Sequence, residues 1–202
     1  MVTTMADYAA IRDAVDSIAT VLRAHITTSG EPGLNGVPVR LDSPRELEIL
    51  NLASAVSCWV HRVDRAVDLV NRPVPRTDPH LQEHRGVPVD LALLITPVNA
   101  DAPTRLLLLG RVLQVLGDHA RLRGPDLIGS LAGTATVLLV TPEQLGSYEL
   151  NLLWSGQQTH VRPGAAYRIS GLTIDTHREP QASSRVLTAE NGVTQIVGAG
   201  AR

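Results

Sequence analysis

A nearly uninterrupted apolar run, Leu91 to Ile95, is the feature that most constrains how this chain can fold. It lies within residues 89–98, a stretch without the regular polar–apolar alternation of a half-exposed strand. A continuous apolar run of strand length is typical of a central strand that is covered on both faces. The run therefore predicts a sheet with further elements packed against both of its sides.

The segments around this strand predict a mixed sheet flanked by helices. Residues 6–28 carry apolar side chains at three- and four-residue steps, which is typical of an amphipathic helix. The residues that the pattern places on its polar side are Arg12, Asp13, Asp16 and Arg23. Strands are expected at residues 37–41, 50–63, 89–98, 134–141 and 166–175. This order predicts an α+β fold with a mixed sheet of four to five strands.

Two helices are expected to follow buried strands. Asp101 and Pro103 give an N-cap and a first-turn proline for one of them. The side chains expected to face the core from it are Leu106, Leu109, Leu113 and Leu116. Thr141 and Pro142 give the same signals for a second helix, which is expected to run to about Trp154.

Composition excludes several classes of function. A net charge of −2 argues against binding of duplex nucleic acid, and an aromatic fraction of 2% argues against stacking on single strands. The single cysteine, Cys58, excludes an internal disulfide and is expected to be a buried, inert thiol. No secretory signal or membrane span is expected, which predicts the cytoplasm of the producing cell. No cofactor is expected.

One short motif matches a metalloprotease signature. His80, Glu83 and His84 fit the pattern H-x-x-E-H, which needs a helix and a third ligand to hold zinc. The motif lies in a charged segment rich in proline, where no amphipathic helix is predicted. A solvated loop is therefore the preferred interpretation, and a small metal-dependent hydrolase stays open as an alternative.

Two segments are candidates for contact with other proteins. Residues 64–86 form a long loop with charges of both signs, which suits either a solvated surface or a contact whose register the charges fix. Residues 177–202 are expected to form an extended C-terminal arm, following a domain over residues 1–176. The candidate interface residues are Arg65, Asn71, Arg72, Arg76, Arg178, Arg185, Val186 and Leu187.

Several stretches, taken in order, resemble the tail-terminator, or cap, proteins of extracellular contractile injection systems. These systems are phage-tail-like particles with an inner tube, a contractile sheath and a baseplate. The resemblance extends over residues 6–176. The stretches that carry it are Asn51–Pro73, Val87–Leu91, Leu94–Pro97, Leu109–Arg111, Val115–Leu116, Leu153–Trp154 and Ala166–Ser170.

The resemblance implies a structural role and no enzymatic activity. Proteins of this kind form a six-fold ring, a hexamer, on the distal end of the tube and sheath, which stops polymerisation. The implied partners are further copies of the chain, the inner tube protein and the sheath protein, in an assembled bacterial particle that can be released. Another tube-end or baseplate adaptor of the same particle is the alternative. The arm, residues 185–197 above all, is expected to add a strand to a neighbour.

Overall fold

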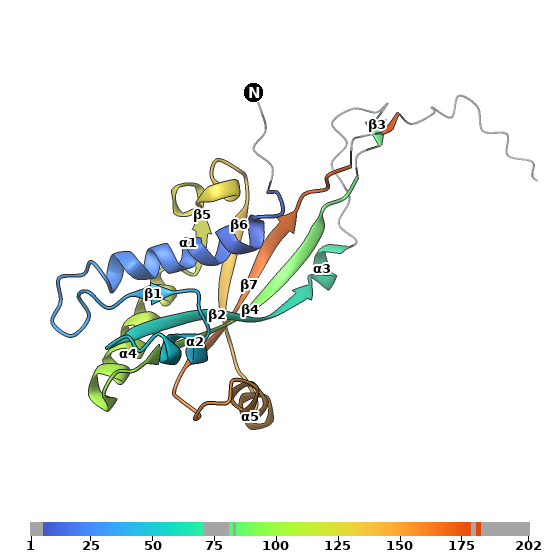
Figure 1. The fold of residues 1–202 in the computed structure, drawn as a ribbon. Coiled ribbons are helices and arrows are strands. Elements are labelled where there is room, and N and C mark those ends of the chain that lie inside the picture. The colour runs from blue at the N-terminus through green and yellow to red at the C-terminus, as the bar shows by residue number, and fades with distance from the viewer. Residues whose placement is uncertain (1–5, 71–80, 83, 179–180, 183–202) are drawn as a thin grey trace, which may run out of the picture. The chain divides into compact units, whose positions relative to one another are not determined.

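The structure is a computed structural model, and it describes residues 6–70, 81–82, 84–178 and 181–182 (Figure 1). Its contacts divide the chain into two units. One unit comprises residues 1–72 and 85–177, and the other comprises residues 73–84 and 178–202. Each unit has a sheet of its own, with six strands in the first and two in the second.

Among the described residues, the first unit has five α-helices and six strands. The helices are α1 (Ala10–His25), α2 (Pro44–Ile49), α3 (Val67–Val70), α4 (Ala102–Asp118) and α5 (Ser147–Gly156). The strands are β1 (Val39–Arg40), β2 (Ala55–Arg65), β4 (Val87–Val98), β5 (Arg121–Arg123), β6 (Val137–Glu143) and β7 (Ala165–Ile174). The spatial order is β1-β2-β4-β7-β6-β5. β1 runs parallel to β2, and all other neighbours are antiparallel.

The predicted α+β fold is confirmed, with one strand more than expected. The additional strand is β5, which forms an edge of the sheet. Its one buried residue, Leu122, lies between the exposed Arg121 and Arg123. Three residues are too few for a periodic pattern, so this strand could not be predicted from the sequence.

β4 is the central strand that its apolar run predicts. Leu91, Leu93 and Ile95 belong to the main core, on the side of the sheet that we term the inner face. Ala92 and Leu94 alternate with them on the opposite, outer face, and both are buried. β2 and β7 pair along the two edges of β4, so nearly all of its backbone lies inside the sheet.

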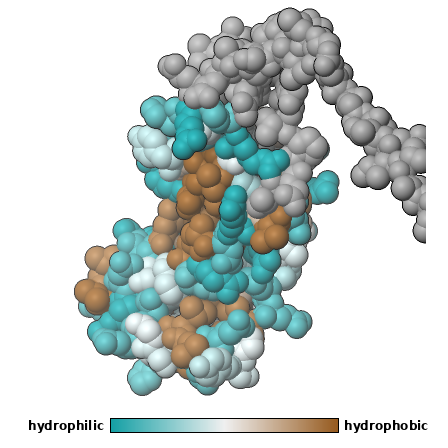
Figure 2. Space-filling view, turned by 90° about the vertical axis from the view of Figure 1, so that its right-hand side faces the viewer, coloured by the Kyte–Doolittle hydropathy of each residue, from teal (hydrophilic) through white to brown (hydrophobic). Residues whose placement is uncertain are grey.

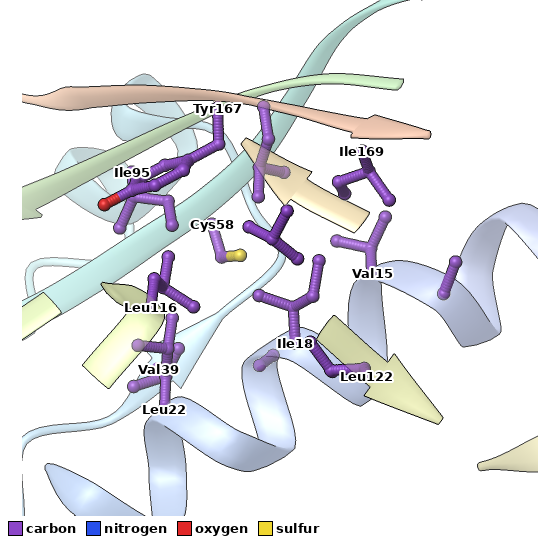
Figure 3. Packing of buried hydrophobic residues seen from close by; sticks show 14 of the residues in the cluster. Val15, Ile18, Leu22, Val39, Cys58, Ile95, Leu116, Leu122, Tyr167 and Ile169 are labelled. Atoms are coloured by element: carbon purple, nitrogen blue, oxygen red, sulfur yellow. The ribbon is translucent and has the colours of Figure 1, made fainter. Parts of the chain in front are cut away.

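The inner face is covered by α1 and α4, which contribute side chains to the same core. Figure 3 shows Val15, Ile18 and Leu22 of α1 facing the strands, with the Cys58 side chain among them. The predicted apolar stripe of the first helix is thus confirmed. Asp13, which the pattern assigns to solvent, is instead buried beside the loop that follows β5.

Two hydrogen-bonding side chains of α1 hold that loop. The Asp13 carboxylate accepts a hydrogen bond of 2.7 Å from the backbone N–H of Ser130. The Ser17 hydroxyl accepts one of 3.1 Å from the N–H of Ile128. Between them lies Gly129 at φ +60°, where an added Cβ would lie 2.3 Å from Asp13 Oδ2. Only glycine suits this close approach of loop and helix.

α4 begins where its sequence predicts, but the side chains that face the core are largely different from those predicted. The Asp101 side chain accepts a hydrogen bond from Thr104 N–H, which confirms the N-cap. The buried side chains are Leu108, Val112, Val115 and Leu116. The predicted stripe is confirmed at Leu116 and wrong at Leu106 and Leu113, which are 62% and 50% exposed, while Leu109 is half-buried.

The helix predicted to begin at Thr141 begins later, at Ser147. Thr141 and Pro142 instead continue β6, where they pair with β7. β5 pairs with β6 only as far as Leu139, so Pro142 lies where β6 has a free edge and the missing N–H is tolerated. α5 is capped differently, by the Glu149 carboxylate accepting from the N–H of Gly146 at 3.0 Å.

The outer face is covered by α2 and α5 at the end where β2 begins. Leu47 of α2 packs with Ala55 and Val98 in a small second core. α5 lies on the side of the sheet away from α1 (Figure 1). Glu48 of α2 accepts hydrogen bonds from Thr159 and Arg162, so the segment after α5 is joined to α2.

The second unit is described only in part. Its strands are β3 (Leu81–Gln82) and β8 (Gln181–Ala182), which pair antiparallel. β3 belongs to the predicted loop over residues 64–86, and β8 to the predicted arm. The two segments therefore join in one small ribbon, a pairing that the sequence did not indicate.

Candidate protein interface

Of the eight predicted interface residues, two lie in the described part of the chain. Arg65 ends β2, is exposed, and pairs in register with Val89 of β4. Arg178 is exposed in the second unit. The residues that lie outside the described part are Asn71, Arg72, Arg76, Arg185, Val186 and Leu187. The assignment of all eight to an interface stays a prediction.

The open half of the outer face carries a network of charges that the sequence analysis did not single out. Glu143 on β6 accepts a hydrogen bond of 2.9 Å from Arg168 on β7 and lies 3.6 Å from Arg62 on β2. Arg62 also donates to Asp64 at 2.7 Å. Exposed ion pairs of this kind contribute little to stability. Together, however, they hold the charged side chains of β2, β6 and β7 in defined positions.

Two titratable groups beside this network are perturbed by burial. Burial, with the nearby Arg62, lowers the pKa of His61 and favours its neutral form. Burial also raises the pKa of Asp90, which lies opposite Asp64 in the register of β2 and β4. Like charges directly opposite each other on paired strands repel, so the carboxylates of Asp64 and Asp90 destabilise each other when both are charged. No sequence pattern could indicate that the residues of this charged face lie together, because they are far apart along the chain.

A concave surface of about 1230 Å³ lies in the first unit, between α3, β7 and the loop before β6. Its lining combines apolar and short polar side chains with four charged ones. The charged residues are Asp68, Asp90, Arg121 and Asp175. Asp175 is fixed by the N-terminal segment, since its Oδ2 accepts from Ala6 N–H at 2.9 Å. The acidic, open lining suits a polypeptide surface better than an enclosed small-molecule site.

The groups with possible chemistry do not assemble into a reactive centre in the part of the chain that is described. Cys58 is fully buried, as predicted, and burial raises its pKa to about 12, which disfavours the reactive thiolate. Among the described residues no group of three or more His, Cys, Asp or Glu side chains could hold a metal ion. Of the zinc motif, His84 is described, whereas His80 and Glu83 lie outside the described residues.

Apolar side chains are exposed on helices at one end of the first unit. On α4 these are Leu106, Leu107 and Leu113, and on α5 they are Tyr148 and Leu152. Figure 2 shows one face of the molecule, where apolar patches are bordered by polar surface. Exposed apolar side chains that gather in this way mark surfaces of interaction. None of the helices in the described ranges is both long and apolar enough to cross a membrane.

The sequence and the fold were compared with known proteins. The profile of the Pvc16 N-terminal domain family matches residues 14–188. A search of curated proteins found no match. Solved structures share the fold at low sequence identity, among them the following two.

The first is the sheath/tube terminator of the extracellular contractile injection system PVC in its extended state. It superposes with a TM-score of 0.63 at 17% identity, over 94% of this chain and 65% of that one. The second is the tube-terminating cap of the anti-feeding prophage, with a TM-score of 0.62 at 16% identity, over 90% of this chain and 61% of that one. The chain thus spans less than two thirds of the length of either structure.

Proposed function

Because the chain belongs to the Pvc16 N-terminal domain family, we propose that it is a structural tail terminator of a phage-tail-like contractile injection system. In this role, copies of the chain form a ring, a hexamer, on the distal end of the inner tube and sheath. The ring ends polymerisation of the tube and holds the last layer of the sheath. The observation that carries the proposal is the fold shared with a sheath/tube terminator over 94% of the chain.

The surface of the described residues fits a role in assembly. Its outer face carries a fixed charge network, and α4 and α5 are among the helices that expose apolar side chains. Ring formation needs a contact between unlike surfaces that closes after a whole number of copies. Binding to tube and sheath needs a further surface, for which the candidates are the loop and arm residues predicted from the sequence. The partners are therefore other copies, the inner tube protein and the sheath protein.

The place of action follows from this role. The chain assembles in the cytoplasm of the producing bacterium, as part of a particle that can later be released. It acts by binding and not by catalysis, in line with the two solved structures, whose descriptions name a terminator and a cap.

Deletion of the gene in a producing strain tests the proposal. We expect electron microscopy of purified particles to show variable lengths and loss of sheath. Expression of the full-length chain should restore a uniform length and retention of the sheath. A chain ending at residue 179 tests the arm, since it should fold without restoring capped particles. A label on the full-length chain should appear at the end opposite the baseplate.

Two results would contradict the proposal. Particles of unchanged length that lack the chain would exclude a terminator role. A label at the baseplate end would instead assign the chain to a baseplate adaptor.

A further inference from the structure

The outward side of α4 is free of charge over most of its length. Between its first turn and Gly117, its exposed residues are Ala102, Pro103, Leu106, Leu107, Gly110, Leu113, Gln114 and Gly117. We term this set the leucine face. Arg105 and Arg111 flank it, and both are half-buried, with hydrogen bonds to Ala100 O and His25 O. A solvent-facing helix of a monomer normally carries charges on this side.

α5 offers a second exposed apolar surface. Tyr148 and Leu152 are one helical turn apart and are 75% and 56% exposed. Trp154 is the only buried residue of this ten-residue helix, whose only charged residue is Glu149. A helix of this length has little stability of its own and depends on packing. Within the described ranges, the chain covers the Trp154 side of α5 and leaves Tyr148 and Leu152 exposed.

The two surfaces lie on opposite sides of the sheet. α4 packs into the inner-face core together with α1. α5 lies on the outer side, where Glu149 contributes to the electrostatic environment of His61. Two different patches on opposite sides of one subunit are the arrangement that a head-to-tail contact requires, whereas a two-fold contact uses one patch twice.

We propose that the leucine face of α4 in one copy packs against Tyr148 and Leu152 of α5 in the next copy. This inference rests on the proposed ring, for which it supplies the contact between subunits. The surfaces complement each other in charge at one point, because Arg105 beside the leucine face and Glu149 on α5 are opposite in sign, whereas Arg111 is already paired with Glu31. Gly110, between Leu106 and Leu113, leaves open space where a side chain of the facing helix fits.

Cross-linking through introduced cysteines tests this contact in assembled particles. The double variant Leu113→Cys with Leu152→Cys, treated with a short bis-maleimide, should give a ladder of oligomers that ends at the closed ring. Each single variant should give no cross-linked product, because a head-to-tail contact brings unlike positions together. Native Cys58 adds no background, since it is fully buried and its thiol is not ionised.

The possible outcomes separate the contact from the proposed function. A dimer from Leu113→Cys alone would overturn the inference in favour of a two-fold contact through α4. A chain present on the particles without a ladder would overturn the inference and leave the terminator role standing. Absence of the wild-type chain from the particles would overturn both.

A pair of charge variants supplies a second readout. Leu113→Glu should abolish incorporation into particles, with a Tm within about 2 °C of wild type, because the side chain is half exposed in the free chain. Thr20→Glu places the same charge on the exposed side of α1 and should leave incorporation unchanged. Equal incorporation of both variants would overturn the inference.

Discussion

α1 and α4 pack against the same face of the same sheet, but the more apolar helix is the more exposed one. α1 has five large aliphatic residues, all at least half-buried, and exposes only Arg12, Thr20 and Ala24. α4 has eight large aliphatic residues, of which four are buried. The core therefore covers most of the large aliphatic side chains of α1 but only about half of those of α4.

Hydrophobicity alone therefore does not identify the side of a helix that faces its own core. Polar residues of α1 make hydrogen bonds within the chain. Asp13 accepts from the backbone N–H of Ser130, and Arg23 donates to Val39 O at 3.1 Å. The exposed leucines of α4 have no comparable task among the described residues. Apolar surface that the fold leaves uncovered is best explained by a partner.

Truncation of buried residues should affect both helices most strongly and equally. Ile18→Ala in α1 and Leu108→Ala in α4 each remove a fully buried side chain, which costs about 2–5 kcal/mol of unfolding free energy. Leu106→Ala should change it by no more than about 0.5 kcal/mol, because Leu106 is mostly exposed. Urea unfolding of the three variants measures this. A loss at Leu106 as large as that at Leu108 would mean that the free chain buries both sides of α4.

The second largest effect on the free energy of unfolding is expected at Asp13, the polar anchor of α1. Burial disfavours the Asp13 carboxylate, but hydrogen bonds from Ser130 and Arg12 outweigh it and hold its pKa below the ordinary value of 3.8. Asp13→Ala leaves the Ser130 N–H without its acceptor and should cost about 1–3 kcal/mol. Asp13→Asn retains one acceptor oxygen and should cost less. An unchanged unfolding free energy for Asp13→Ala would contradict the anchoring role.

The same anchor predicts a pH dependence. Because the folded state has the lower pKa, the unfolded chain binds more protons, and this contribution to stability is full above the ordinary pKa. It is lost as the pH falls through the lower pKa of folded Asp13. The stability difference between wild type and Asp13→Asn should therefore shrink below about pH 4. Urea titrations between pH 2 and 6 would show this, and a difference independent of pH would contradict it.

Local signals predicted the central parts of the fold. The run around Leu93 identified β4, the Asp101 cap located the start of α4, and the alternation after Ala166 identified β7. The burial of Asp13 could not be predicted in this way, because it depends on Ser130, which is 117 residues away in the sequence. The rotation of α4 could not be predicted either, since both of its long sides are apolar and only its packing against α1 and β4 decides between them.

The candidate interface shows the same limit. Sequence patterns led to charged loop residues such as Arg65, since charges beside prolines indicate an exposed segment. They passed over Leu106 and Leu113, because apolar residues at helical spacing are normally assigned to the core. The network around Glu143 combines three strands, and only the sheet brings those residues together.

The smallest effect should come from Gly110, at the centre of the leucine face. Glycine within a helix costs about 0.5–1 kcal/mol relative to alanine, and nothing lies within 4 Å of the position that a Cβ would take. Gly110→Ala should therefore raise the Tm of the free chain by about 1–4 °C. Gly129→Ala is the matched control and should lower the Tm, because its Cβ would meet Asp13. If Gly110→Ala also lowered the Tm, the leucine face would already be covered in the free chain, and the contrast between α1 and α4 would no longer point to a neighbouring copy.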